Sequence, residues 1–115
     1  MIFCFDLDGS LDIFPDQFRE IMSSLRANNH EVHIVTGCRS TQVTPEIISD
    51  KIKKLEGLDL INYYDKLVIV ANPKNKVAKQ KVEYMRGINA HVLFDNDPHN
   101  IKAAKKANFL ALRVE

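Results

Sequence analysis

Residues 2–10 read Ile-Phe-Cys-Phe-Asp-Leu-Asp-Gly-Ser, a short apolar run that ends in two acids and a glycine. Four apolar residues followed by a turn signal predict a buried strand of the kind found in parallel sheets. Asp6 and Asp8 then stand just beyond the carboxyl end of that strand. Open α/β sheets bind their ligands at this edge. The stretch therefore indicates both the fold and the place to look for a site.

The remaining chain continues the same alternation of short apolar runs and segments with helical period. Further strands are predicted at 32–35, 67–71, 92–94 and 109–114, and helices from Pro15 to Asn28, at 45–57, at 74–86 and from Pro98 to Asn108. Right-handed crossovers place such helices on both faces of the sheet. We therefore predict a three-layer α/β sandwich with an open, mainly parallel five-stranded Rossmann-like sheet and no cap domain.

Length and composition favour one domain over residues 1–115. The 115 residues include 16 Lys and Arg against 15 Asp and Glu, a formal charge of +1, which argues against a generally nucleic-acid-binding or membrane-binding surface. The two cysteines are too few for a disulfide framework. No apolar stretch approaches the ~18 residues of a membrane span, and no signal peptide is recognisable. We expect a cytoplasmic protein without a membrane partner, and its oligomeric state stays open.

Three of the predicted strands end in polar residues. Asp6 and Asp8 follow the first strand, Thr36 and Gly37 the second, and Asp95 with Asp97 the fourth. If the carboxylates converge to about 5 Å, each like-charged pair costs about 3 kcal/mol at an effective dielectric constant of about 20. A bound cation would relieve this repulsion. Oxygen ligands, with no His/Cys set at zinc spacing, favour Mg²⁺.

These segments resemble, in order, the four motifs of the haloacid dehalogenase-like superfamily. The segment 6–10, Asp-Leu-Asp-Gly-Ser, is similar to the first motif, Asp-x-Asp-Gly-Thr or -Val, with Ser10 in place of Thr. Val35-Thr36-Gly37 resembles the second motif and 94–101 the fourth. The third motif is a lysine, for which Lys81 fits best and Lys79 is next. The resemblance covers the whole chain.

The resemblance implies a capless phosphatase, a hydrolase of phosphoric monoesters that works through an aspartyl-phosphate. Asp6 would be the nucleophile and Asp8 the general acid and base. The phosphoryl group would be held by Ser10, Thr36, Gly37 and either Lys79 or Lys81. Mg²⁺ would be held by Asp6, the backbone carbonyl of Asp8, Asp95 and Asn96. Asn96 stands where a second acid is common, so Asp97 is an alternative ligand.

Two other function classes remain open in the sequence. One is a catalytically weak interaction module that keeps the fold, and Asn96 is the feature in its favour. The other is a phospho-acceptor signalling domain, but no acid ends the third strand at Val70-Ala71-Asn72. The expected partner is a phosphorylated substrate, and an uncapped site admits a macromolecule such as a nucleic-acid end. The lysines that would contact a polynucleotide are Lys74, Lys76, Lys79 and Lys81.

Overall fold

The computed structural model describes residues 1–73 and 76–115. Strands and helices alternate along the chain as expected. The strands are β1 (Ile2–Phe5), β2 (Glu31–Gly37), β3 (Lys66–Val70), β4 (Val92–Asp95) and β5 (Leu110–Arg113). The helices are α1 (Pro15–Ala27), α2 (Pro45–Gly57), α3 (Val77–Gly87) and α4 (Pro98–Lys106). A tight turn, Leu7–Leu11, connects β1 to the segment before α1.

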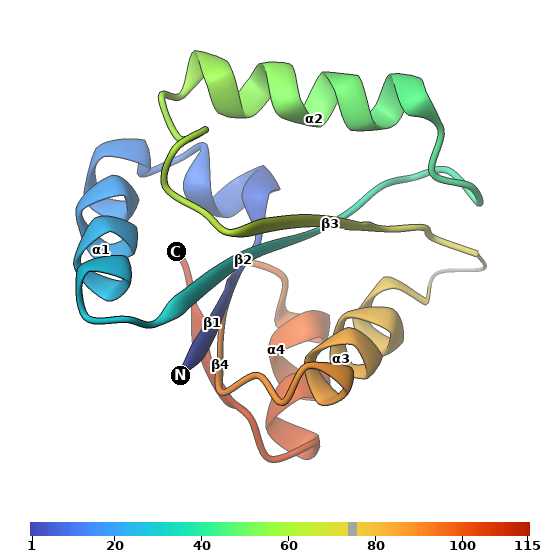
Figure 1. The fold of residues 1–115 in the computed structure, drawn as a ribbon. Coiled ribbons are helices and arrows are strands. Elements are labelled where there is room, and N and C mark those ends of the chain that lie inside the picture. Colours follow the sequence, from blue (N-terminus) through green and yellow to red (C-terminus); the bar gives the residue numbers. More distant parts are fainter. Residues whose placement is uncertain (74–75) are drawn as a thin grey trace.

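The five strands form one parallel sheet in the order β3-β2-β1-β4-β5. Helices α1 and α2 cover one face and α3 and α4 the other (Figure 1). The three-layer α/β fold with an open parallel sheet is therefore confirmed. The strand order reverses between β1 and β4, and in such sheets the crevice beyond that point is the usual ligand site.

Neighbouring residues of β1 fill the two cores. Cys4 packs with α3 and α4 on one face, and Phe5 packs with α1 and α2 on the other. Successive side chains of a strand point to opposite faces, so a strand covered on both sides needs apolar residues throughout. This explains the unbroken apolar run at 2–5, which positions Asp6 at the sheet edge.

The helices and strands begin and end close to the positions that the capping and turn residues predict. The Thr44 hydroxyl accepts a hydrogen bond from the Ile47 amide at 3.3 Å and so caps α2. Strand β2 is longer than predicted because its pairing with β3 continues to Gly37. Helix α3 begins at Val77 rather than at 74, and the predicted start at Lys74 lies outside the described residues.

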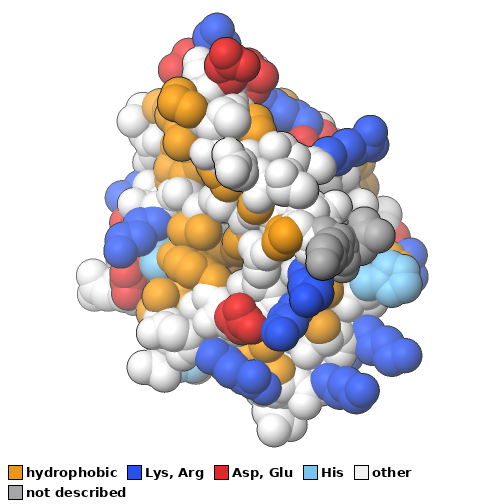
Figure 2. Space-filling model, turned by 90° about the vertical axis from the view of Figure 1, so that its right-hand side faces the viewer, with side chains coloured by type: hydrophobic (Ala, Val, Ile, Leu, Met, Phe, Trp, Pro, Cys, Tyr) orange, Lys and Arg blue, Asp and Glu red, His pale blue; other side chains and the backbone are white. Residues whose placement is uncertain are grey.

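None of the described helices has the length and apolar character needed to span a membrane. The carboxyl ends of β2 and β3 point to the right in Figure 1. Figure 2 views the molecule from that side, with α3 and α4 in its lower half.

Candidate functional site

A large cleft opens at the carboxyl edge of the sheet. Its volume is about 1420 Å³, and its walls come from the ends of β1, β2 and β3, from α2, and from the starts of α3 and α4. The lining includes Asp8, Gly37, Cys38, Lys51, Asn72 and Asn100. The cleft therefore lies where the topology predicts a ligand site.

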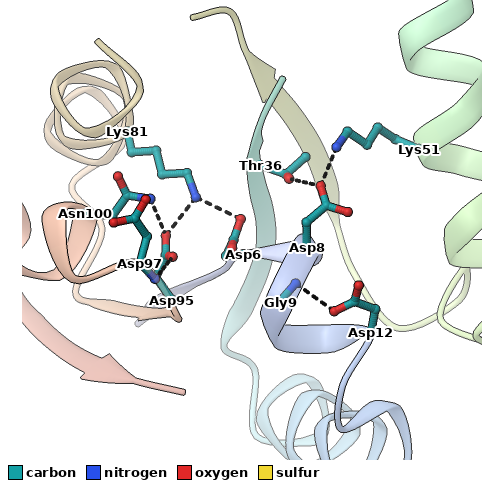
Figure 3. Close-up of polar contacts among 10 residues, drawn as sticks. All are labelled: Asp6, Asp8, Gly9, Asp12, Thr36, Lys51, Lys81, Asp95, Asp97 and Asn100. Carbon is teal, nitrogen blue, oxygen red and sulfur yellow. Dashed lines mark hydrogen bonds and ion pairs between the residues drawn. The ribbon is translucent and has the colours of Figure 1, made fainter. Parts of the chain in front are cut away.

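Lys81 joins two of the predicted site acids. Its ammonium group donates to Oδ1 of Asp6 at 2.9 Å and to Oδ2 of Asp95 at 2.7 Å, and all three side chains are buried (Figure 3). The repulsion expected between Asp6 and Asp95 is thus relieved by a lysine from α3. Of the two lysines considered from the sequence, Lys81 reaches the site.

Burial and the lysine act in opposite directions on the protonation of this trio. Burial raises the pKa of Asp6 to about 6, and the Lys81 charge limits the rise. Burial alone would lower the pKa of Lys81, but the Asp6 and Asp95 carboxylates outweigh it, so that pKa is raised. Lys81 therefore stays charged beside its partners.

Both side-chain oxygens of Asp95 accept hydrogen bonds from other groups of the protein. Its Oδ2 also accepts from the Asn100 amide at 3.0 Å, and its Oδ1 accepts from the backbone amide of Asp97 at 2.9 Å. Asp97 in turn caps α4 by accepting from the His99 amide at 2.8 Å. Asp95 and Asp97 therefore hold the turn between β4 and α4, and Asp97 also lines the cleft.

The side chain of Asn96 contacts the turn after β1, and we call this contact with Asp6 and Asp8 the Asn96 corner. Its amide lies 3.0 Å from both the backbone oxygen of Asp8 and Oδ2 of Asp6, and donating Nδ2 to them satisfies both. The approach depends on Gly9, where φ is +82° and an added Cβ would lie 2.3 Å from the Asn96 amide. The glycine of the Asp-Leu-Asp-Gly stretch is required by this contact and by its left-handed backbone.

Two lysines of α2 hold Asp8. Lys51 donates to Oδ2 and Lys54 to Oδ1, each at 2.5 Å, and Lys54 also pairs with Asp12 at 2.9 Å. The Thr36 hydroxyl donates to Oδ2 of Asp8 at 3.4 Å (Figure 3). Burial would raise the pKa of Asp8, but the hydrogen bonds and charges of both lysines outweigh it and lower that pKa.

Sequence reasoning missed Lys51, Lys54 and Asn100. A signal existed for the lysines, because residues three apart on a helix share a face. Helix α2 starts after the Thr44 cap, soon after β2 ends, so the face that carries these lysines lies near the carboxyl edge of the sheet. Asn100 had only its place in the first turn of α4 as a signal.

Several predicted phosphate ligands lie apart from one another. Gly37 lines the cleft. Thr36 is buried beneath it beside Asp8. Ser10 is fully buried away from the lining, and Lys79 lies on the exposed side of α3. The structure therefore brings together Asp6, Asp8, Thr36, Gly37, Lys81, Asp95 and Asn96, but not Ser10 or Lys79.

The oxygens available for a metal are mostly not side-chain acids. In the described chain no group of three or more His, Cys, Asp or Glu side chains is arranged to hold a metal ion. Turning the Asn96 amide by half a rotation places its Oδ1 3.0 Å from Oδ2 of Asp6 and from the Asp8 carbonyl oxygen. Octahedral Mg²⁺ with ligands at about 2.1 Å separates adjacent oxygens by about 2.9 Å. In that orientation Asp6, the Asp8 carbonyl and Asn96 would be three oxygen donors of the type that Mg²⁺ prefers.

Comparison with known proteins identifies the fold but not a family. No protein-family model and no curated protein sequence matches the chain. Among solved structures, an uncharacterized protein from Corynebacterium glutamicum is 17% identical with a TM-score of 0.64, covering 99% of this chain and 84% of the other.

Two further solved structures are universal stress proteins. One, from Burkholderia pseudomallei, is 16% identical with a TM-score of 0.59, covering 98% of this chain and 94% of its own. The other is described as a universal stress protein in complex with cAMP. It is 15% identical with a TM-score of 0.58, covering all of this chain and 96% of its own.

These neighbours overturn the family and activity expected from the motifs. They are universal stress proteins rather than haloacid dehalogenase-like phosphatases, so that assignment is wrong. The predicted phosphatase with an aspartyl-phosphate intermediate, and its hydrolase class, are wrong with it. The physical reason is that any open parallel sheet gathers its strand-ending polar residues at one edge. Three polar strand ends in order, with a lysine on a helix between the second and third of them, are thus compatible with more than one family on this fold.

Proposed function

We propose that this protein binds a nucleotide together with Mg²⁺ in the cleft at the carboxyl edge, without covalent chemistry. The observation that carries the proposal is the cleft of about 1420 Å³ at the reversal of strand order, with Asp8, Lys51 and Lys54 in its lining. A structural neighbour of the same topology is described in complex with cAMP, a nucleotide. The phosphorylated partner expected from the sequence is, on this proposal, a nucleotide.

Lys51 and Lys54 are the proposed phosphate ligands. Both line the cleft and both contact the exposed carboxylate of Asp8. An incoming phosphate offers the two ammonium groups more oxygen acceptors than one carboxylate does. Phosphate binding therefore replaces contacts to Asp8, and the lysines are already held in place for it.

The Asn96 corner is the proposed magnesium site. Once the amide is turned, Asp6, the carbonyl of Asp8 and Asn96 supply three oxygens, with Oδ1 of Asn96 3.0 Å from each of the other two. Phosphate oxygens and water would complete the coordination, which is how Mg²⁺ is commonly held beside nucleotides. Asp95 contributes by holding Lys81 and the start of α4, and not as a direct ligand.

The rest of the cleft lining suits a nucleoside. Ile47, Val77 and Ala78 supply apolar lining. Asn72, also in the lining, has a buried Oδ1 with no hydrogen-bond partner in the described chain. An unpaired buried acceptor favours a ligand that brings a donor, and the amino group of a base or a ribose hydroxyl does so.

Calorimetric titration with ATP, AMP and cAMP, with and without Mg²⁺, tests the proposal. We expect saturable binding that Mg²⁺ strengthens for ATP. The double substitution Lys51→Gln with Lys54→Gln should weaken ATP binding by about tenfold or more. Lys53→Gln is the matched control, because Lys53 is exposed on α2 and does not line the cleft. Unchanged affinity in the double variant, or no binding of any of the three nucleotides, would show the proposal to be wrong.

Both cysteines, Cys4 and Cys38, are free thiols. Together with nucleotide binding, this supports a cytoplasmic location as part of the proposal.

A further inference from the structure

A second hollow lies between α3 and α4, next to the cleft but facing outward. Its volume is about 680 Å³, and it meets the cleft at Ala78. Apart from Ala78, none of the residues that line this groove belongs to the proposed nucleotide site.

The floor of the groove is apolar and made of small side chains. Ala78 and Val82 are four residues apart on α3, and Ala103 and Ala107 are four apart at α4 and its end. Residues at this spacing share one helix face, so two matching stripes form a shallow channel. Small side chains allow another backbone to come close.

The rim of the groove is strongly cationic. Lys76, Lys79, Arg86 and Lys106 line it with a single acid, Glu83. Glu83 lies 4.0 Å from Lys79. In the described parts of the chain, no carboxylate stands within 4.0 Å of Lys76, Arg86 or Lys106. The whole protein carries a formal charge of only +1, so this positive charge is local.

Figure 2 shows that Lys and Arg side chains prevail over acidic ones in the lower half of the view, where α3 and α4 lie. Several Lys and Arg side chains surround a central acidic side chain in the lower half of the view. Of the lysines expected to contact a polynucleotide, Lys76 and Lys79 line the groove, Lys81 is buried, and Lys74 lies outside the described residues. The cations that do gather come from two different helices.

We propose that this groove binds an acidic amphipathic helix of a partner protein. The apolar stripes would receive the apolar face of such a helix, and its flanking Glu and Asp side chains would pair with the rim cations. A nucleic acid fits less well, because none of the lining residues in the described chain is aromatic and bases have nothing to stack on.

The test uses fluorescence anisotropy with a labelled, Ala-based peptide of roughly 15 residues, long enough for partial helicity. Leu lies along one face of the peptide and Glu flanks that face. A scrambled peptide of the same composition and a single-stranded oligodeoxynucleotide of the same net charge are the competing probes. We expect saturable binding of the amphipathic peptide, and binding at least about tenfold weaker for the scrambled one.

Matched double variants locate the binding. Arg86→Gln with Lys106→Gln should weaken the amphipathic peptide by about tenfold. Lys102→Gln with Lys105→Gln removes the same charge from the exposed side of α4 outside the groove, and should change the affinity by less than about twofold. Equal effects of the two double variants, or equal binding of the scrambled peptide, would overturn the proposal. Tighter binding of the oligonucleotide would assign the groove to nucleic acid instead, and no peptide binding up to about 1 mM would also overturn it.

Discussion

The ammonium group of Lys81 lies 2.7 Å from Oδ2 of Asp95, and neither side chain is more than 2% exposed. The same lysine holds Asp6 at 2.9 Å, so three charges share one buried position at the sheet edge. Removing the lysine leaves two buried carboxylates without a counter-charge.

The substitution Lys81→Met should therefore destabilise the fold by about 3–5 kcal/mol. Urea unfolding followed by circular dichroism measures this. Lys79→Met is the control, because Lys79 lies two residues before Lys81 on the exposed side of α3, and its effect should stay within about 0.5 kcal/mol. If both variants unfold at the same urea concentration, the ion pairs of Lys81 do not stabilise the protein.

A second prediction concerns pH. The pKa of Asp6 is raised from 3.8 to about 6 in the folded state. The folded protein then binds the Asp6 proton more tightly than the unfolded chain does. The stabilisation from this proton is complete below pH 3.8 and is lost as pH rises through about 6.

The variant Asp6→Asn should lack this contribution. The free energy of unfolding of wild type minus that of the variant should therefore decrease as pH rises from about 4 to about 6. Denaturant titrations at several pH values measure that difference, in which the other titrating groups largely cancel. A difference that does not change with pH across this window would show that the pKa of Asp6 is not raised.

The contact between Gly9 and Asn96 predicts a specific effect of added bulk. Gly9→Ala should destabilise the protein by roughly 1–3 kcal/mol, because φ is +82° and the new Cβ meets the Asn96 amide. It should also abolish thermal stabilisation by Mg²⁺, since Asn96 can no longer reach the Asp8 carbonyl oxygen. Gly57→Ala is the control, with open space around the added Cβ. Equal Mg²⁺ stabilisation of wild type and Gly9→Ala would place the metal elsewhere.

If the protein binds ATP without catalysing a reaction on it, the ATP stays intact. ATP incubated with the protein and Mg²⁺ should be recovered unchanged, as followed by ³¹P NMR. Release of phosphate that requires the protein and disappears in Asp6→Asn would contradict this expectation.

Much of the fold could be predicted from the sequence, because its signals are local. The apolar run at 2–5, the Thr44 cap and the strand-ending acids gave the alternation and the ligand edge. Strand limits shifted where sheet pairing extended an element, as at Gly37. The pairing of Asp8 was not predictable from spacing, since Lys51 reaches it from 43 residues away, whereas Lys81, which contacts Asp6 from 75 residues away, was expected at the site from the resemblance.

The family and the activity were mispredicted for a related reason. The motifs show only that polar residues follow the strands, and this pattern is shared by several functions on this fold. Which charge neutralises which carboxylate depends on tertiary packing. Here Lys81 neutralises Asp6 and Asp95, while Lys51 and Lys54 hold Asp8.

The most direct measurement of the central claim is a titration of ¹⁵N-labelled protein with ATP and Mg²⁺, following backbone amide shifts. A nucleotide in the cleft should move the amides of Gly37, Cys38, Lys51 and Asn96 along one saturable curve. The amides of Arg86 and Lys106, outside the cleft, should not move. Saturable shifts confined to the groove around Arg86 and Lys106, or no saturable shift of the cleft amides, would contradict nucleotide binding at the carboxyl edge.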